Sequence, residues 1–144
     1  MLIEDNQDDS EAIRRGFKGG QHNIPIAWFN SSHKALEHLN LLNQSKKPED
    51  LPTLIMLDLN MPGIDGRELL VLIKQLSFVK HIPIIIFTTS ADEKDVLQCY
   101  QNGASSYLQK PVVFKKLKEA CETLEKYWYG IAITPKTDKN QADP

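Results

Sequence analysis

Two unbroken apolar runs constrain the fold more than any other feature of the chain. They cover residues 53–58 (TLIMLD) and 83–89 (PIIIFTT), and neither alternates between apolar and polar positions. A strand that is apolar at successive positions is covered on both faces of its sheet, as in the parallel sheets of α/β proteins. The first run ends in a carboxylate, Asp58, which precedes the turn sequence NMPG. Because burying an unpaired carboxylate costs free energy, Asp58 calls for a functional explanation.

Short strand-like runs alternate with longer runs of helical periodicity along the chain. The pattern predicts strands at residues 1–4, 24–29, 53–58, 83–89 and 105–110. It predicts helices at residues 10–20, from Ser31 or Ser32 to 42, and at residues 65–76 and 92–101. A last predicted helix follows Pro111 and extends to residue 128. Strands and helices in alternation pack as a parallel sheet with right-handed crossovers. The sequence therefore predicts a doubly wound α/β fold with a five-stranded parallel sheet and five helices.

Length and composition indicate a single domain. A chain of 144 residues has the usual size of one domain, and 41% hydrophobic with 25% charged residues is typical of a soluble globular protein. We expect the domain at residues 1–129. Residues 130–144 are polar, contain two prolines and are expected to form a flexible tail.

The same data disfavour several classes of function. A net charge of −2 gives no sign of the basic patch of a nucleic-acid-binding protein. No apolar run reaches the roughly 20 residues that cross a bilayer, and no signal peptide is visible. Cys99 and Cys121 lie outside any CxxC pattern, which is typical of reduced, structural thiols. We therefore expect a cytoplasmic protein with no nucleic-acid or membrane partner.

Polar side chains close four of the five predicted strands. Glu4 and Asp5 end the first strand, Asp58 the third, Thr88 the fourth and Lys110 the fifth. The carboxyl ends of parallel strands lie at one edge, and doubly wound sheets place their sites there. We therefore expect these side chains to converge although they are far apart in the sequence.

The chemistry of this set points to a cation and to phosphorus. Three neighbouring carboxylates repel one another, and a divalent cation relieves that repulsion. A few oxygen ligands suit Mg²⁺, which keeps several waters and often shares a phosphate oxygen. A carboxylate beside Mg²⁺, a lysine and a hydroxyl can act as a nucleophile toward phosphorus. Phosphoryl transfer needs mainly positioning and neutralisation of charge, which these groups supply.

Each residue taken alone has an ordinary explanation. Glu4 and Asp5 could be acids at a helix N-terminus, and Asp58 could be a turn residue. Thr88 could be a β-branched strand residue, and Lys110 a solvated surface lysine. The functional interpretation depends on their joint placement, each at the end of its own strand.

Four motifs carry a resemblance to a known family: LIEDN, LIMLDLNMPGIDG, IIIFTTS and GASSYLQKP. In this combination and order they resemble the receiver domain of two-component response regulators, over about residues 1–128. The resemblance implies a flavodoxin-like strand order 2-1-3-4-5. It also implies a phosphoacceptor that uses Mg²⁺ and assists its own phosphorylation and dephosphorylation, rather than an enzyme with a separate substrate.

The resemblance assigns roles to the acidic residues. Asp58 is implied to be the phosphoacceptor and a ligand of Mg²⁺. Asp5 is implied to bind the ion directly, and Glu4 to act mostly through water. The backbone carbonyl of Asn60 would be a further protein ligand.

Residues of the last two strands are implied to form a switch. Thr88 would hydrogen-bond the phosphoryl group, and Lys110 would pair with another of its oxygens. Thr89 is the small residue expected beside Thr88, where it leaves the acid accessible. Tyr107 lies three residues before Lys110, at the position of the family's aromatic switch residue.

Other positions of the motifs concern timing and backbone. The side chains of Asn60 and Ser90 are implied to tune the lifetime of the phosphoryl group. The Lys110–Pro111 bond resembles the family's cis peptide. Two departures stand out: Glu4 replaces the commoner aspartate, and the first strand is short, so that Met1 could mark an incomplete start.

Within the family, the sequence is most similar to stand-alone regulators that are paired with bacterial phytochrome-type histidine kinases. This likeness rests on Thr89–Ser90, Tyr100, residues 112–114 and Tyr127–Trp128. The implied partner is a histidine kinase or a histidine phosphotransfer protein. We also expect a homodimer through the face of the 92–101 helix, the 105–110 strand and the last helix.

Three other functions remain as alternatives. A dehalogenase-like phosphatase would have a second acid two residues after Asp58, where Asn60 stands. A flavodoxin-like FMN binder would have a loop rich in Ser, Thr or Gly after the first strand, but EDNQDDSE is acidic and repels phosphate. The third alternative is a degenerate receiver that acts as a constitutive interaction module, although every expected acid, hydroxyl and lysine is present.

Overall fold

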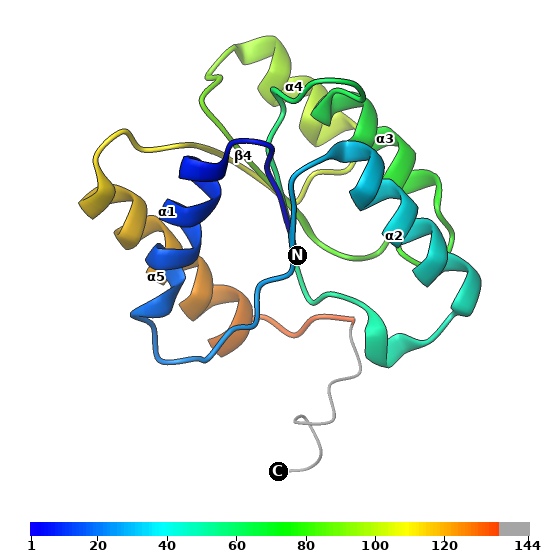
Figure 1. Cartoon of the computed structure of the whole chain (residues 1–144), viewed down its shortest axis with the longest axis horizontal. Coiled ribbons are helices and arrows are strands. Elements are labelled where there is room, and N and C mark those ends of the chain that lie inside the picture. The colour runs from blue at the N-terminus through cyan, green and yellow to red at the C-terminus, as the bar shows by residue number, and fades with distance from the viewer. Residues whose placement is uncertain (136–144) are drawn as a thin grey trace.

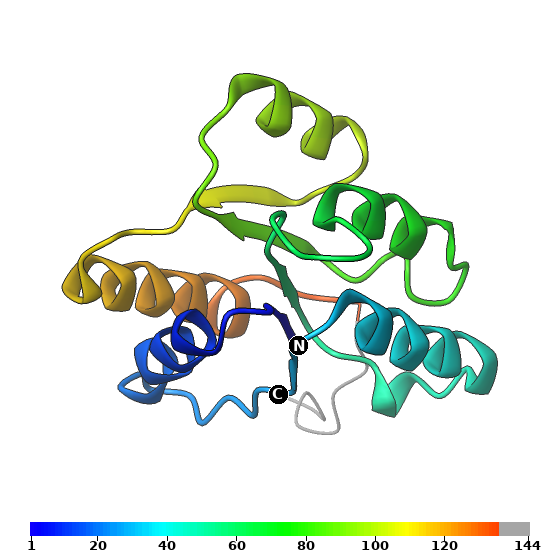
Figure 2. The same ribbon diagram turned by 45° about the horizontal axis from the view of Figure 1, so that its top comes forward.

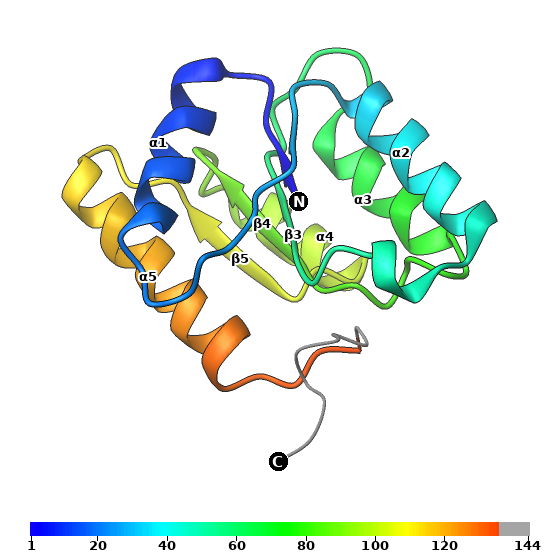
Figure 3. The ribbon, with the colours of Figure 1, turned by 60° about the horizontal axis from the view of Figure 1, so that its bottom comes forward.

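The computed structural model describes residues 1–135, which form a five-stranded parallel sheet between two layers of helices (Figures 1 and 3). The strands are β1 Leu2–Ile3, β2 Trp28–Phe29, β3 Ile55–Leu57, β4 Ile84–Thr88 and β5 Ser106–Gln109. Their order is β2-β1-β3-β4-β5, and all neighbouring pairs are parallel. The predicted fold class and strand order are confirmed.

Five α-helices cover the sheet. They are α1 Gln7–Lys18, α2 Ser32–Ser45, α3 Gly66–Gln75, α4 Glu93–Gln101 and α5 Phe114–Gly130, and a short 3₁₀ helix, Pro48–Asp50, follows α2. The pair α1 and α5 packs on one face, and α2, α3 and α4 lie on the other (Figure 2). Among the described residues, no helix combines the length and apolar character needed to span a membrane.

The predicted strands and helices exist, but several ends differ. Only Trp28 and Phe29 of the predicted 24–29 strand join the ladder, and Pro25, which has no N–H to donate, lies in the part that stays outside it. The first helix begins at Gln7 rather than Ser10, because the side chain of Asn6 accepts a hydrogen bond from the Asp9 amide and caps it.

The boundary predicted between domain and tail lies close to the end of α5. This helix ends at Gly130, and the described chain continues to residue 135. Residues 136–144 of the predicted flexible tail lie outside the described residues. The division at residue 129 therefore stays a prediction.

The two central strands fill the core on both faces of the sheet. Side chains from β3 and β4 alternate between two apolar clusters, one under α2 and α3 and the other under α1 and α5. The first cluster receives Ile55, Leu57, Ile84 and Ile86, and the second receives Met56, Ile85 and Phe87. The unbroken apolar runs are thus explained by burial on both faces.

The buried carboxylate of Glu125 fixes the loop between α1 and β2 to α5. Oε1 of Glu125, on α5, accepts hydrogen bonds from the backbone N–H of His22 at 2.5 Å and pairs with His22 Nδ1 at 2.9 Å. Gly20 lies so close to this carboxylate that a Cβ atom there would overlap it. A side chain at position 20 would therefore displace the Glu125 carboxylate from its hydrogen bond with the His22 amide.

We expect Gly20→Ala to destabilise the protein by about 1–3 kcal/mol, the usual cost of overpacking a filled site. Gly130→Ala is the matched control, because a Cβ atom there would meet its nearest neighbour, His22 Cε1, only at 3.9 Å. Urea denaturation measures both variants. Equal free energies of unfolding for the two would contradict this account of the loop.

Candidate functional site at the carboxyl edge of the sheet

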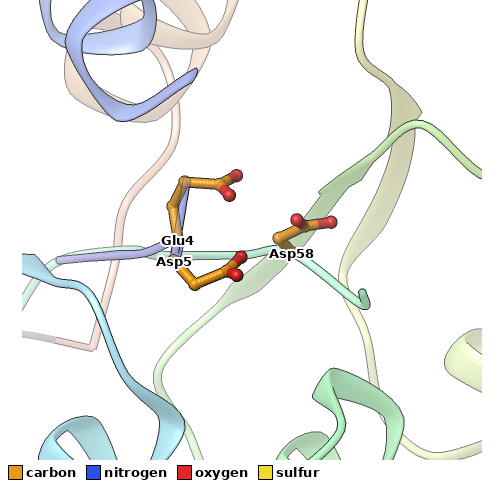
Figure 4. A group of neighbouring side chains, drawn as sticks. All are labelled: Glu4, Asp5 and Asp58. Carbon is orange, nitrogen blue, oxygen red and sulfur yellow. The ribbon is translucent and has the colours of Figure 1, made fainter. Parts of the chain in front are cut away.

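Three carboxylates meet where β1 and β3 end (Figure 4). One oxygen from each of Glu4, Asp5 and Asp58 lies within 4.8 Å of the others. The parallel ladder produces this placement, because the Asp58 amide donates to the Ile3 carbonyl at 3.1 Å and so aligns the ends of the two strands. Glu4 and Asp58 are both buried. The predicted convergence of these acids is observed.

Within residues 1–135, Lys110 supplies the one ammonium that pairs with acids of this site. Nζ of Lys110, after β5, lies 2.5 Å from Glu4 Oε2, 3.0 Å from Asp9 Oδ2 and 3.3 Å from Asp58 Oδ2. Its backbone N–H donates to the Thr88 carbonyl at 2.7 Å, so the sheet fixes the start of the side chain. One positive charge faces three carboxylates here, which leaves the site with a negative balance.

Burial sets the protonation of this cluster. Burial raises the pKa of Glu4 to about 7, and the charge of Asp58 adds to the rise, while Lys110 opposes it. Burial also lowers the pKa of Lys110, but the hydrogen bond and charge of Glu4, followed by the charge of Asp58, outweigh it. The pKa of Lys110 therefore lies above its ordinary value, and the lysine stays charged near neutral pH.

The donor set fits a hard divalent cation. Glu4, Asp5 and Asp58 offer oxygen atoms only, which is the preference of Mg²⁺ and Mn²⁺ rather than of softer metals. A cation here would offset the carboxylate charge that Lys110 leaves unpaired. The predicted third protein ligand, the backbone carbonyl of Asn60, follows Asp58 in the same loop. Its role as a ligand stays a prediction.

The loop after Asp58 is held in place by the start of α3. The Gly66 amide donates to the Leu59 carbonyl at 2.9 Å. A Cβ atom on Gly66 would collide with the backbone carbonyl of Asp58, so only glycine permits this approach. Asp65 caps α3 by accepting a hydrogen bond from the Arg67 amide at 2.8 Å. The motif residues from Asp65 onward therefore position the acid.

The ends of β4 and β5 carry the predicted switch residues. Thr88 is fully buried, and its Oγ1 has no hydrogen-bond partner within residues 1–135. A buried hydroxyl without a partner is costly, so this group is available to a ligand at the site. The hydroxyl of Tyr107 donates to the Ser90 carbonyl at 2.8 Å, which ties β5 to the loop after β4. Thr89 is exposed between Thr88 and Ser90.

An ion-pair network fixes the loop after β4 to the helices beside it. Arg67, on α3, makes two hydrogen bonds of 2.6 Å to the carboxylate of Asp95, on α4. The same carboxylate accepts a bond from Ser90 Oγ at 2.8 Å. The hydrogen bonds from Arg67, joined by that of Ser90, lower the pKa of Asp95 to about 2. We call Arg67, Asp95 and Ser90 the α3–α4 clamp.

One prediction about the backbone is wrong. The described residues contain no cis peptide bond, so the Lys110–Pro111 bond is trans. The trans form is the more stable for most X–Pro bonds, by about 0.5–1 kcal/mol. The sheet hydrogen bond from the Lys110 amide to the Thr88 carbonyl orients the lysine without help from a cis bond.

Two residues that hold the acidic site in place, Asp9 and Trp28, were not predicted from the sequence. Asp9 has no role among the predictions made from the sequence, yet its carboxylate is a direct partner of Lys110. Its position in the first turn of the helix that follows Glu4 and Asp5 was the available signal. Trp28 was also missed: its Nε1–H donates to the Glu4 carbonyl at 2.8 Å and steadies the acidic loop.

Comparison with known proteins identifies the family. Residues 1–122 match the response regulator receiver domain, and the chain therefore belongs to that family. Receiver domains interact with histidine kinases or phosphotransfer proteins.

Two relatives match nearly the whole chain. The probable methanogenesis regulatory protein FilR2 of Methanothrix harundinacea is 35% identical over 135 residues, which cover 94% of this chain and 86% of FilR2. The response regulator Rcp1 of Synechocystis is 33% identical over 139 residues, which cover 94% of this chain and 91% of Rcp1.

Solved structures of response regulators have the same fold as this chain. The phosphorylated cyanobacterial phytochrome response regulator RcpA superposes with a TM-score of 0.80 at 28% identity, over 93% of this chain and 95% of RcpA. The Mn²⁺-bound form of Rcp1 gives a TM-score of 0.79 at 30% identity, over 93% of this chain and 96% of Rcp1. The chain is thus similar to stand-alone regulators associated with phytochromes.

The α3–α4 clamp predicts a pH dependence of stability. Since the pKa of Asp95 is about 2 in the folded protein and 3.8 ordinarily, the pair stabilises the fold above about pH 4 and loses this effect as the pH falls toward 2. We expect the stability advantage of the wild type over Asp95→Asn to shrink by about 2 kcal/mol across that range.

Chemical denaturation at several pH values measures this change. Asp50→Asn is the control, because Asp50 is exposed and has no ion pair within the described residues. A constant difference between wild type and Asp95→Asn from about pH 5 to 2 would rule out the clamp as a source of stability.

Proposed function

We propose that this protein is a single-domain response regulator that accepts a phosphoryl group on Asp58 from a histidine kinase or a histidine phosphotransfer protein. One observation carries the proposal. The buried carboxylate of Asp58 lies 3.3 Å from the Lys110 ammonium, beside two further acids. The hydroxyl of Thr88, one strand away, has no hydrogen-bond partner within residues 1–135. This combination supplies a nucleophile, a cation site and two groups that can bind phosphoryl oxygens.

The reaction follows from these positions. An oxygen of Asp58 attacks phosphorus, and the new O–P bond forms as the N–P bond of the donor histidine breaks. The imidazole keeps the electron pair of the N–P bond and leaves as a neutral ring, because its other nitrogen already carries a proton. Mg²⁺, held by Asp5, Asp58, the Asn60 carbonyl and, through water, Glu4, would neutralise charge on the transferred oxygens. Lys110 remains charged and pairs with one of those oxygens.

The phosphoryl group then changes the surface of the protein. It adds about −1.5 to −2 of charge and several acceptor oxygens next to Thr88. The buried hydroxyl of Thr88 turns to donate to it, and the loop from Thr88 to Ser90 moves with it. Because Tyr107 donates to the Ser90 carbonyl and Ser90 to Asp95, that movement reaches β5 and α4. A local change of charge thus biases a two-state surface.

The input is proposed to be a phytochrome-type histidine kinase, and the location cytoplasmic. RcpA and Rcp1 support the proposed kinase input, because RcpA is a phytochrome response regulator and both superpose over most of the chain. The acceptor domain is proposed to occupy residues 1–129. The side chains of Asn60 and Ser90 are proposed to set how long the phosphoryl group persists.

A homodimer through α4, β5 and α5 is a further part of the proposal. Leu97 and Tyr100, on α4, are apolar or aromatic side chains exposed on this face. Association would remove them from water. We expect Leu97→Glu to keep phosphorylation but to reduce the apparent mass in light scattering. A monomeric wild type, with and without phosphorylation, would contradict the dimer alone.

The test of phosphorylation is intact mass after incubation with a small phosphoryl donor such as phosphoramidate. We expect the mass to rise by one phosphoryl group when Mg²⁺ is present and to stay unchanged when Mg²⁺ is removed by a chelator. Asp58→Asn removes the nucleophile and should abolish the rise. Asp50→Asn removes an exposed carboxylate near the opposite edge of the sheet and should behave like the wild type.

The competing function is a degenerate receiver that acts as an interaction module without phosphorylation. It predicts a folded protein whose mass stays unchanged under every condition. A mass increase that persists in Asp58→Asn would instead reject Asp58 as the acceptor.

A further inference from the structure

We propose that Asp9 is a positioning residue that keeps the Lys110 ammonium at the site when Glu4 and Asp58 turn to a divalent cation. The inference rests on the proposed function, since it concerns the lysine that pairs with a phosphoryl oxygen. It assigns a task to a fourth acid that lies outside the group of potential cation ligands.

The ammonium of Lys110 is hydrogen-bonded to three different carboxylates. Its ammonium has three N–H groups, and its Nζ lies within hydrogen-bond distance of Glu4, Asp9 and Asp58, one oxygen from each. The lysine side chain is only 9% exposed. A buried ammonium that loses its partners costs free energy, so the identity of these partners decides where it stays.

Asp9 differs from the other two partners in what else it can bind. The oxygens of Glu4 and Asp58 belong to the group that could hold a cation, and those of Asp9 do not. A cation at that group competes with Lys110 for Glu4 and Asp58, and it repels the ammonium because both are positive. Asp9 is then the carboxylate that still pairs with the Lys110 ammonium.

The start of α1 holds Asp9 in position for this task. The Asp9 amide donates to the side chain of Asn6 at 2.9 Å, and this cap fixes the first turn of the helix. The Asp9 carboxylate is 45% exposed, so it is hydrated on one side and bonded to Lys110 on the other. It therefore holds the ammonium without being part of the buried acidic group.

Asp8 provides a matched control. It lies next to Asp9 in the same helical turn, carries the same charge and is exposed. Among residues 1–135, Asp8 makes no ion pair, whereas Asp9 pairs with Lys110. Asp8→Asn and Asp9→Asn therefore change the net charge equally, and only Asp9→Asn removes a partner of the lysine.

The first measurement is the rate of phosphorylation of the full chain by phosphoramidate at saturating Mg²⁺. We expect Asp9→Asn to be about tenfold slower than wild type, the scale of one lost charge-assisted hydrogen bond. Asp8→Asn should stay within about twofold, and Asp9→Glu should recover part of the loss. In a Lys110→Ala background, Asp9→Asn should have no further effect, because the two residues act together.

The second measurement does not depend on phosphorylation. An amine-specific acylating reagent, followed by peptide mass mapping, reports how well the Lys110 amine is held. With Mg²⁺ present, we expect Lys110 of Asp9→Asn to be labelled several-fold faster than in wild type or in Asp8→Asn. A merely structural role of Asp9 would change labelling of other lysines as well, and it would lower stability.

The outcomes separate the two claims. Faster labelling of Lys110 in Asp9→Asn, without phosphorylation of the wild type, would overturn the proposed function and keep the role of Asp9. Phosphorylation of the wild type, with equal rates and equal labelling in Asp8→Asn and Asp9→Asn, would overturn the role of Asp9. A loss in Asp9→Asn that persists in the Lys110→Ala background would overturn it as well.

Discussion

The ammonium of Lys110 among buried carboxylates is the interaction on which the rest of the site depends. It permits Glu4 and Asp58 to lie next to each other inside the protein, where their repulsion would otherwise be costly. The sheet makes this possible, since adjacent parallel strands align Asp58 with the end of β1 and hydrogen-bond Lys110 to the end of β4. The unbroken apolar runs belong to the same arrangement. Because β3 and β4 are buried on both faces of the sheet, only the residues at the strand ends can reach a ligand.

The acidic group connects to the rest of the molecule through a few polar contacts. Trp28 holds the loop that carries Glu4, and Gly66 allows α3 to approach the carbonyl of Asp58. On the other side, the α3–α4 clamp and the Tyr107–Ser90 bond join the loop after β4 to α4 and β5. Short chains of contacts therefore connect the loop that carries Asp58 with α4 and with β5. This arrangement suits a protein that reports a chemical event to a partner by a change in its surface.

The sequence was sufficient for the fold and for the convergence of the polar residues that close the strands, because both follow from short-range rules. Apolar runs mark the buried strands, and the polar residues that close them converge once the strands are parallel. The contacts that the sequence did not predict join elements that are distant along the chain. No local pattern indicates the pair of Asp9 with Lys110 or the pair of Arg67 with Asp95. The late start of β2 and the trans Lys110–Pro111 bond show the same limit, since the backbone there is set by its tertiary neighbours.

The most direct test of the account is the chemical location of the transferred group. An acyl phosphate on an aspartate is reduced by borohydride to homoserine, and peptide mass mapping identifies the converted residue. We predict conversion at Asp58 alone, after treatment with a small phosphoryl donor and Mg²⁺. Conversion of another acid of the cluster, such as Asp9 or Asp5, or a phosphoryl group on a hydroxyl or a histidine, would contradict the central role given to Asp58.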